Sequence, residues 1–232
     1  MDESKNKISV IMSCFNSGDT VSSAIESILQ QTYKNFEFLI MDDASTDNTL
    51  ELLRDYKNID SRIQIFKNTS NIGLTKSLNF LIQKTSGAYI ARQDADDLSY
   101  NERLKTQIKF LENSDFVAHT TRAKITNSHR TVPRLSLLLP KKLIIRFRNP
   151  YIHGTLLIEK NILNKIGNYN EHFYFAQDYK LFWDLNKAGY KVKNSFLTLY
   201  ELNMENNISN KYKSEQQYFA ECVKKETTPK KH

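Results

Sequence analysis

The chain has 232 residues, of which 33 are Lys or Arg and 26 are Asp or Glu, so its formal net charge is +7. A chain of this length can bury roughly 70% of its unfolded surface and needs no disulfide or metal to hold its core. Its 40% hydrophobic and 25% charged residues are typical of a globular protein. They exclude collagen-like, coiled-coil and wholly disordered chains.

Three further features bear on where the protein works. The sequence has no run of about 18 apolar residues, so it predicts no helix that spans a membrane. Its charged start, residues 1–5, leads directly into a strand pattern and is unlike a signal peptide. Cys14 and Cys222 lie far apart and in no metal-like spacing. These features predict a reduced, cytoplasmic location, and the positive charge would suit an anionic partner.

Strand and helix patterns alternate through the first hundred residues. The apolar run at residues 8–12 predicts a buried strand, and apolar residues at helical spacing from Val21 to Leu29 predict a helix that starts near Gly18. Similar patterns predict strands at 36–41, 62–66 and 87–92, and helices at 45–56, 73–84 and around 104–111. This alternation predicts right-handed crossovers and a parallel sheet covered on both faces.

The alternation weakens after residue 114. The sequence predicts, in order, a strand at 116–120, a loop at 123–133, a helix at 135–147, a strand at 155–158, a helix at 177–188 and a closing strand at 191–199. We expect residues 115–222 to continue the domain of residues 1–114 and to form the far wall of a cleft. Residues 223–232 are rich in Lys, Glu, Thr and Pro, which predicts a disordered basic tail.

Acidic residues follow two of the predicted strands, at the sheet edge where ligands bind in such folds. Asp94, Asp96 and Asp97 come directly after the fourth strand. Their carboxylates can hold Mg²⁺ or Mn²⁺, cations that prefer oxygen ligands and keep room for substrate phosphates. The alternative is a solvated loop that caps the next helix. Asp42 and Asp43 follow the second strand and can either bind a nucleotide or cap a helix.

Three other positions are candidates for the same site. Phe15 follows the first strand and can stack on a base, or it can be an ordinary core aromatic residue. Asp178 lies in the first turn of a predicted helix, where the helix dipole should keep it ionised. It can then accept a proton, or it can serve only the helix terminus. His153 precedes a short strand and by itself indicates no chemistry.

These pieces, in this order, resemble the family-2 inverting glycosyltransferases of the GT-A fold, and most closely the bacterial enzymes that build lipopolysaccharide, capsule and related cell-surface glycans. The resemblance spans residues 8 to about 195. The matching stretches are residues 8–16, 27–33, 36–49, 71–79, 89–97, 103–104, 149–155 and 177–179. It implies a Rossmann-like, mostly parallel α/β sheet flanked by helices, with a donor half at 1–114 and an acceptor half at 115–222.

The resemblance also implies a role for individual residues. Asp178 matches the catalytic base of the family, which often has Glu-Asp where this chain has Gln177 and Asp178. Asp94 and Asp96 match the DxD motif that holds Mn²⁺ or Mg²⁺. The positions implied to bind the nucleotide-sugar donor are Ser13, Phe15, Asn16, Asp43, Asp94, Ala95 and Asp96. Phe15 stands where the family usually has Tyr, so it keeps a stacking face without the hydroxyl group.

The implied reaction is metal-dependent transfer of a sugar from a nucleotide donor, with UDP favoured by the resemblance, to a hydroxyl group of a glycan or a lipid-linked glycan. Two other functions stay open: a protein that binds anionic surfaces, and a nucleotidyltransferase. Residues 141–148 alternate basic and apolar side chains. This stretch predicts either a helix packed on the acceptor half or a peripheral contact with the inner face of a membrane. No basic run is interleaved with stacking aromatics, so nucleic acid is not expected as a partner.

Overall fold

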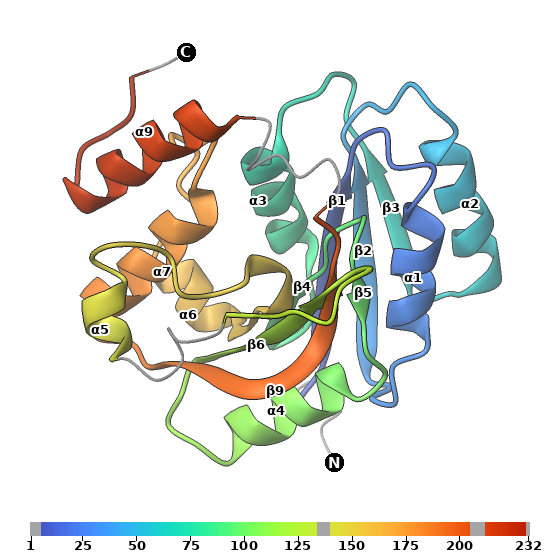
Figure 1. The fold of residues 1–232 in the computed structure, drawn as a ribbon. Coiled ribbons are helices and arrows are strands. Elements are labelled where there is room, and N and C mark those ends of the chain that lie inside the picture. The colour runs from blue at the N-terminus through green and yellow to red at the C-terminus, as the bar shows by residue number, and fades with distance from the viewer. Residues whose placement is uncertain (1–5, 134–139, 205–211, 231–232) are drawn as a thin grey trace.

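The computed structural model describes residues 6–133, 140–204 and 212–230. A curved sheet forms its centre, and helices cover both faces (Figure 1). The strands are β1 (Ile8–Cys14), β2 (Phe36–Asp42), β3 (Ile63–Lys67), β4 (Tyr89–Arg92), β5 (Leu98–Ser99), β6 (Ala118–Ile125), β7 (Thr131–Val132), β8 (Leu157–Glu159) and β9 (Val192–Leu202). Within the described ranges, no helix is both long and apolar enough to cross a membrane.

The helices follow the predicted alternation in the first half and are more numerous than predicted in the second. They are α1 (Val21–Leu29), α2 (Thr49–Ile59), α3 (Leu74–Lys84), α4 (Arg103–Glu112), α5 (Lys141–Ile144), α6 (Lys160–Lys165), α7 (Gln177–Lys187) and α9 (Lys213–Lys224), with a single 3-10 turn, η2 (His153–Thr155). Ser45, Thr46 and Asp47, expected as cap residues of the next helix, come just before α2, which begins at Thr49, and they also bind the loop after β1.

The first four strands form the parallel part of the sheet, in the order β3-β2-β1-β4. β1 lies between β2 and β4, so the sheet grows from β1 to one side through β2 and β3 and to the other side through β4. Such a switch in strand order opens a crevice at the carboxyl ends of the strands. The acidic loops after β2 and β4 therefore lie at one edge of the sheet. The predicted α/β architecture with a mostly parallel sheet is confirmed.

Antiparallel strands join the second half to the first, and the sequence patterns did not predict this. β8 pairs with β4 and β6 in antiparallel fashion, and β9 runs parallel to β6 and antiparallel to β5. The two halves thus share one sheet. As a consequence β9, which is last in the chain among the strands, returns to the loop that follows β4.

The core has one cluster of buried side chains on each face of the sheet. Alternate residues of β1 separate cleanly: Val10 and Met12 pack with α1, α2 and α4, whereas Ile11 packs with α3, α6, α7 and α9. Figure 1 shows these two groups of helices on opposite sides of the sheet. The period of two in strands and the apolar stripes of the helices account for this division.

Two expectations for the second half were wrong. Residues 123–133 do not form a loop, because β6 continues to Ile125 and turns back into β7, which pairs with it at Ala123 and Lys124. The helix expected at 135–147 is also shorter, since α5 covers only Lys141–Ile144 and turns follow it to Arg148. Residues 135–139 of that expected helix lie outside the described residues.

The expectation of a disordered tail from residue 223 was wrong for residues 223–230. Residues 223 and 224 belong to α9, whose Phe219, Cys222 and Val223 are buried against the core. After the helix, the Thr227 N–H donates to the Cys222 carbonyl, and Glu226 forms an ion pair with Lys187 of α7. The buried apolar face of α9 therefore orders the start of this tail, although the polar composition of residues 223–232 predicted disorder. Cys14 and Cys222 are both free and buried.

Candidate active site

The loops after β1 and β2 are tied to each other at the carboxyl edge of the sheet. The Asn16 backbone N–H donates to Ser45 Oγ at 3.0 Å, and Asn16 Oδ1 accepts a hydrogen bond from the Thr46 N–H at 2.8 Å. Asn16 has a φ of +49°, a left-handed conformation that asparagine tolerates. Asn16, which was predicted to bind the nucleotide, therefore shapes this loop. The neighbouring Phe15 has 47% of its surface exposed. Ser13 is half-buried at the end of β1.

Asp43 is buried just beyond β2 and binds the loop that precedes α3. Its Oδ1 accepts hydrogen bonds from Asn68 Nδ2 at 2.7 Å and from the Ile72 N–H at 3.0 Å, and its Oδ2 accepts one from the Gly73 N–H at 2.8 Å. The structure thus gives Asp43 a part in building the site wall, which the sequence did not reveal. A carboxylate has about four acceptor positions, so the predicted contact with the base is compatible with these three bonds.

The DxD residues follow β4 and differ in their surroundings. Asp94 Oδ1 pairs with Arg92 Nη2 at 2.6 Å, and the Asp94 N–H donates to Tyr200 Oη at 3.2 Å. The Ala95 side chain is buried, whereas Asp96 is at the surface. Desolvation by nearby protein atoms and repulsion from Asp94 raise the pKa of Asp96 to about 6. The loop therefore carries negative charge that the protein itself does not fully balance.

Asp97 lies beneath the two DxD carboxylates. It is buried, and its Oδ1 accepts a hydrogen bond from the Asn203 N–H at 2.7 Å. Burial, together with repulsion from Asp94 and Asp96, raises the pKa of Asp97. Asp97 thus anchors the end of β9 to the DxD loop and does not face the solvent as Asp96 does.

A buried arginine that sequence reasoning did not assign holds the DxD loop from below. Arg103 of α4 is fully buried; its Nη2 donates to the Arg92 carbonyl at 2.7 Å and its Nη1 to Ser99 Oγ at 2.6 Å. Its guanidinium group also lies 5.1 Å from the ring centre of Tyr200. Arg103 was part of a matched motif, but its partners lie on three other segments, and only the folded structure shows that they converge.

Because Gly154 of η2 has no side chain, the DxD loop can lie close to η2 and β9 of the second half. A Cβ atom at this position would lie 2.5 Å from Tyr200 Oη and 2.8 Å from Asp94 Oδ2, which is too close for either atom. The absence of a side chain at 154 therefore lets β9, η2 and the DxD loop meet.

We expect Gly154→Ala to lower kcat/KM for sugar transfer by about a hundredfold, because displacement of catalytic groups by 1 Å can cost that much. Steady-state kinetics and the thermal unfolding midpoint should both be measured. Gly189→Ala is the control: its φ of +82° gives backbone strain, but a Cβ there meets no atom within 4 Å. If both variants lose activity in proportion to their stability, the close approach at Gly154 has no special role.

Asp178 lies in the first turn of α7 and is half-buried. Its Oδ2 accepts a hydrogen bond from Asn149 Nδ2 at 2.7 Å, and its Oδ1 accepts one from the Tyr179 N–H at 2.7 Å. We expected the helix dipole to keep Asp178 ionised; burial acts against this and raises the pKa of Asp178, and the charge of Asp94 adds to the rise. Asn149, which binds Asp178, lies five residues before Gly154, which closely approaches Asp94, so a short segment connects Asp178 to the DxD loop.

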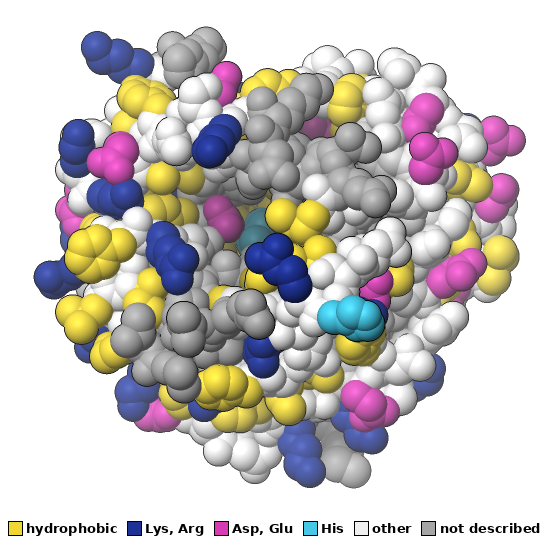
Figure 2. Space-filling view, viewed as in Figure 1, with side chains coloured by type: hydrophobic (Ala, Val, Ile, Leu, Met, Phe, Trp, Pro, Cys, Tyr) yellow, Lys and Arg dark blue, Asp and Glu magenta, His cyan; other side chains and the backbone are white. Residues whose placement is uncertain are grey.

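A histidine and a tyrosine bind each other next to Gly154. His153 Nε2 is 2.6 Å from Tyr169 Oη. Burial, with the positive charge of Arg92, lowers the pKa of His153 to about 3, so this histidine is neutral at physiological pH. Tyr169 is buried, and its burial raises the pKa of its hydroxyl group. In Figure 2 a hollow opens near the centre of the face, with acidic and histidine side chains at its base.

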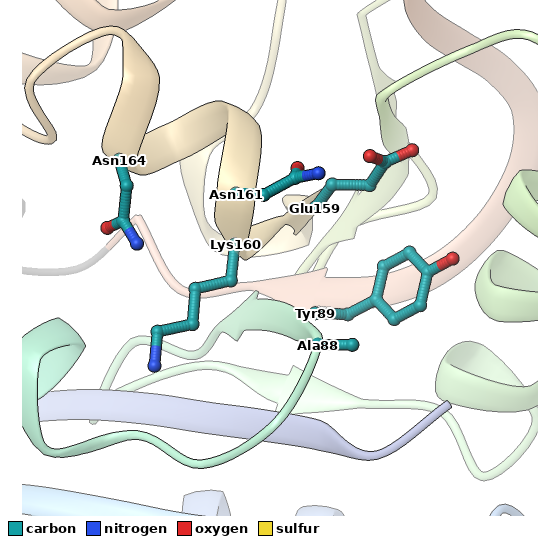
Figure 3. A pocket seen from close by; sticks show the side chains of 6 residues that line it. All are labelled: Ala88, Tyr89, Glu159, Lys160, Asn161 and Asn164. Atoms are coloured by element: carbon teal, nitrogen blue, oxygen red, sulfur yellow. The ribbon is translucent and has the colours of Figure 1, made fainter. Parts of the chain in front are cut away.

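The structure also contains a cavity of about 330 Å³ away from these acids, lined by Ala88, Tyr89, Glu159, Lys160, Asn161 and Asn164 (Figure 3). It lies at the start of β4, and therefore at the opposite edge of the sheet from Asp94. Lys160 Nζ is bound to the Thr85 carbonyl at 2.5 Å. We place the candidate active site at the carboxyl edge, because the convergent acidic groups and the buried arginines are there.

The residues at the carboxyl edge fit a divalent cation held jointly by protein and ligand. In the described part of the chain, no three His, Cys, Asp or Glu side chains group closely enough to hold a metal by themselves. Asp94 and Asp96 nevertheless provide two neighbouring carboxylates with unbalanced charge. One or two carboxylates completed by phosphate oxygens are a usual arrangement for Mg²⁺.

An α/β sheet with paired acids at its switch point is suited to bind a ligand through a cation at that edge. The sequence profile of Glycosyl transferase family 2 matches residues 9–173. This chain belongs to that family, and the predicted family and enzyme class, a glycosyltransferase, are confirmed.

Two curated relatives illustrate the likeness. EpsE of Bacillus subtilis strain 168 is 36% identical over 166 residues, which cover 70% of this chain and 60% of EpsE. WfaP of Escherichia coli is named a UDP-Glc:α-D-GlcNAc-diphosphoundecaprenol β-1,3-glucosyltransferase. It is 30% identical over 220 residues, which cover 89% of this chain and 81% of WfaP. The chain thus spans less than two thirds of EpsE.

Solved structures share the fold. TarS 1–349 from S. aureus in complex with UDP matches with a TM-score of 0.74 and 22% identity, over 94% of this chain and 64% of that structure. The mannosyltransferase PcManGT from Pyrobaculum calidifontis, in complex with GDP-Man and Mn²⁺, matches with a TM-score of 0.75 and 18% identity, over 91% of this chain and 61% of PcManGT. At these identities the matches establish the fold alone.

Proposed function

We propose that this chain transfers a sugar from a UDP-sugar to a hydroxyl group of a glycan or lipid-linked acceptor, with inversion at the anomeric carbon. The observation that carries this proposal is that one short segment connects Asp178 to the DxD loop: Asn149 donates to Asp178 Oδ2 at 2.7 Å, and Gly154, five residues later, is so close to the loop that a Cβ atom there would lie 2.8 Å from Asp94 Oδ2. A proton acceptor and a diphosphate-binding loop would then face the same space. WfaP, which uses UDP-Glc by name, and TarS with bound UDP support the choice of nucleotide.

Asp96 and Asp94 would hold Mn²⁺ or Mg²⁺ together with the diphosphate of the donor. Bound there, the cation would offset the negative charge that builds on the leaving nucleotide. The Mn²⁺ complex of PcManGT supports this choice of metal. Arg92 and Arg103 fix the backbone on which the two carboxylates stand.

Asp178 serves as the base. The acceptor hydroxyl group attacks the anomeric carbon from the side opposite to the nucleotide and must lose its proton as the new bond forms. Ionised Asp178 takes that proton, and Asn149 holds the carboxylate in place through the bond to Oδ2. One displacement inverts the anomeric centre and leaves no sugar attached to the enzyme. Phe15 would stack on the base, with Ser13 and Asp43 beside it.

A panel of UDP-, GDP- and dTDP-sugars tests this proposal. Slow hydrolysis of one donor class in the presence of Mn²⁺, and faster sugar transfer when an acceptor is added, are the expected results. Release of pyrophosphate from nucleoside triphosphates would instead indicate a nucleotidyltransferase. Binding to anionic surfaces without turnover of any donor would indicate a protein with no transferase activity.

A further inference from the structure

The positive charge of this chain is concentrated in one segment of the second half. Residues 116–158 contain eight Lys or Arg and no Asp or Glu, which leaves 25 Lys or Arg against 26 Asp or Glu in the rest of the chain. The whole positive excess of the protein therefore comes from the segment that includes β6, α5 and η2. A negatively charged partner would be attracted to the exposed basic residues of this segment.

Within that segment, α5 and the turn after it present apolar and basic side chains together at the surface. Phe147 is 74% exposed and Leu143 is 56% exposed. The basic side chains of the same stretch, Lys142, Arg146 and Arg148, are exposed as well. These five residues are called the α5 patch below. Hydrophobic and basic side chains are intermixed on the corresponding side of the molecule (Figures 1 and 2).

The α5 patch is held in place by residues that point the other way. Ile144 and Ile145 are buried, and the Ile145 carbonyl accepts a hydrogen bond from Tyr179 Oη at 2.5 Å. Ile144 and Ile145 therefore anchor this segment to the core. The exposed side chains of Leu143 and Phe147 do not contribute to that core. Large apolar side chains exposed next to one another usually mark an interaction site.

We propose that the α5 patch docks on a bilayer that contains anionic phospholipid. The charged residues of the segment that carries Leu143 and Phe147 are all basic, because no acidic residue lies between positions 116 and 158. This pattern matches a uniformly negative surface with an apolar interior, in which basic side chains bind headgroups while the two apolar side chains enter the interface. A protein partner would be expected to present charges of both signs.

The position of the patch links it to the candidate active site. Arg148 directly precedes Asn149, whose amide holds Asp178, and the Pro150 carbonyl accepts a hydrogen bond from Asn194 of β9. A bilayer bound to the α5 patch would therefore lie beside the acceptor half. The membrane contact itself does not depend on the proposed reaction, whereas its use, to present a lipid-linked acceptor to Asp178, rests on that proposed function.

Co-sedimentation with vesicles tests the proposal. We expect the full chain to bind vesicles of phosphatidylcholine with 30% phosphatidylglycerol and to bind vesicles of phosphatidylcholine alone far more weakly. Each Lys or Arg near an anionic surface contributes about a fivefold gain in binding. The triple variant Lys142→Gln, Arg146→Gln, Arg148→Gln should thus bind about a hundredfold more weakly. Phe147→Ser with Leu143→Ser should reduce binding further at high salt, where charge is screened.

Matched controls come from the opposite side of the molecule, around α2. Lys34→Gln, Arg54→Gln and Lys57→Gln remove the same net charge from exposed positions, and Ile59→Ser removes an apolar side chain that is 76% exposed. These variants should bind vesicles within about twofold of the wild type, because their positions face away from the α5 patch. Circular dichroism and thermal unfolding should show that all variants fold.

Three results would overturn the proposal: wild-type protein that ignores anionic vesicles, patch variants that bind as well as the wild type, or α2 controls that lose binding equally. A dimer in light scattering that Leu143→Ser with Phe147→Ser dissolves would assign the patch to a second copy instead. Donor hydrolysis in solution separates the two proposals, because patch variants should keep it at the wild-type rate. If no donor is turned over but vesicle binding follows the patch, the proposed reaction alone fails.

Discussion

Replacement of Asp178 with Asn is expected to lower the rate of sugar transfer by about a hundredfold to ten-thousandfold, which is the usual contribution of a general base. The affinity for the nucleotide should stay near that of the wild type, since the proposed role of Asp178 concerns the acceptor proton. Asn keeps the shape of the side chain and can still accept the hydrogen bond that Asn149 donates to Oδ2. Single-turnover kinetics and calorimetry with UDP would measure the two effects separately.

Stability and pH provide further checks on Asp178. Because burial raises its pKa, the ionised form costs free energy in the folded protein at neutral pH; Asp178→Asn removes this cost but also loses one of the two accepted hydrogen bonds, so its unfolding midpoint should be measured beside its rate. As the pH falls through this raised pKa, the base becomes protonated, so we expect the wild-type rate to decline at a higher pH than an ordinary aspartate would give. The residual rate of the Asn variant should lack this dependence.

Asp184→Asn is a suitable control for Asp178→Asn, because Asp184 lies on the same helix and pairs with Lys180 at 2.6 Å. This variant should transfer sugar within about twofold of the wild type, since a helix pair of this i,i+4 kind contributes little. A large loss of UDP affinity in Asp178→Asn would instead place Asp178 in the donor site and remove it from the role of base.

Asp96→Ala is expected to remove the part of donor affinity that depends on a divalent cation. Loss of even an indirect partner of a metal commonly costs about tenfold to a hundredfold in metal affinity, so loss of a carboxylate that binds the cation directly should cost at least as much. Calorimetry with UDP, with Mn²⁺ or with a chelator, would show the effect. The wild type should bind UDP more tightly with Mn²⁺, and the variant should bind it equally in both conditions.

Asp55→Ala is the control for Asp96→Ala, because it removes an exposed acid of α2 on the far side of the sheet. It should keep the gain in UDP affinity that Mn²⁺ gives. If Asp96→Ala keeps this gain as well, Asp96 does not bind the cation, and Asp94 would be left as the only DxD carboxylate for that role.

The donor half of the fold could be predicted because its signals are local. The apolar runs of β1 and β2 and the helical spacing in α1 each lie within about ten residues, and burial on both faces of a parallel sheet demands such patterns. The acids after β2 and β4 could be found for the same reason, since the carboxyl ends of parallel strands meet at one edge. The second half joins through antiparallel strands and short helices, whose patterns are weaker.

By itself, the sequence determined which elements form the parallel sheet, which acidic residues follow its strands and which family the motifs resemble. Only the tertiary structure decided how those acids are held and charged. The partners of Asp94 include Tyr200, more than 100 positions away, and the space it needs depends on Gly154. The pKa of Asp178 likewise follows from burial among distant segments and not from its helix terminus. Contacts between remote residues, and the desolvation they cause, leave no periodic pattern in a single sequence.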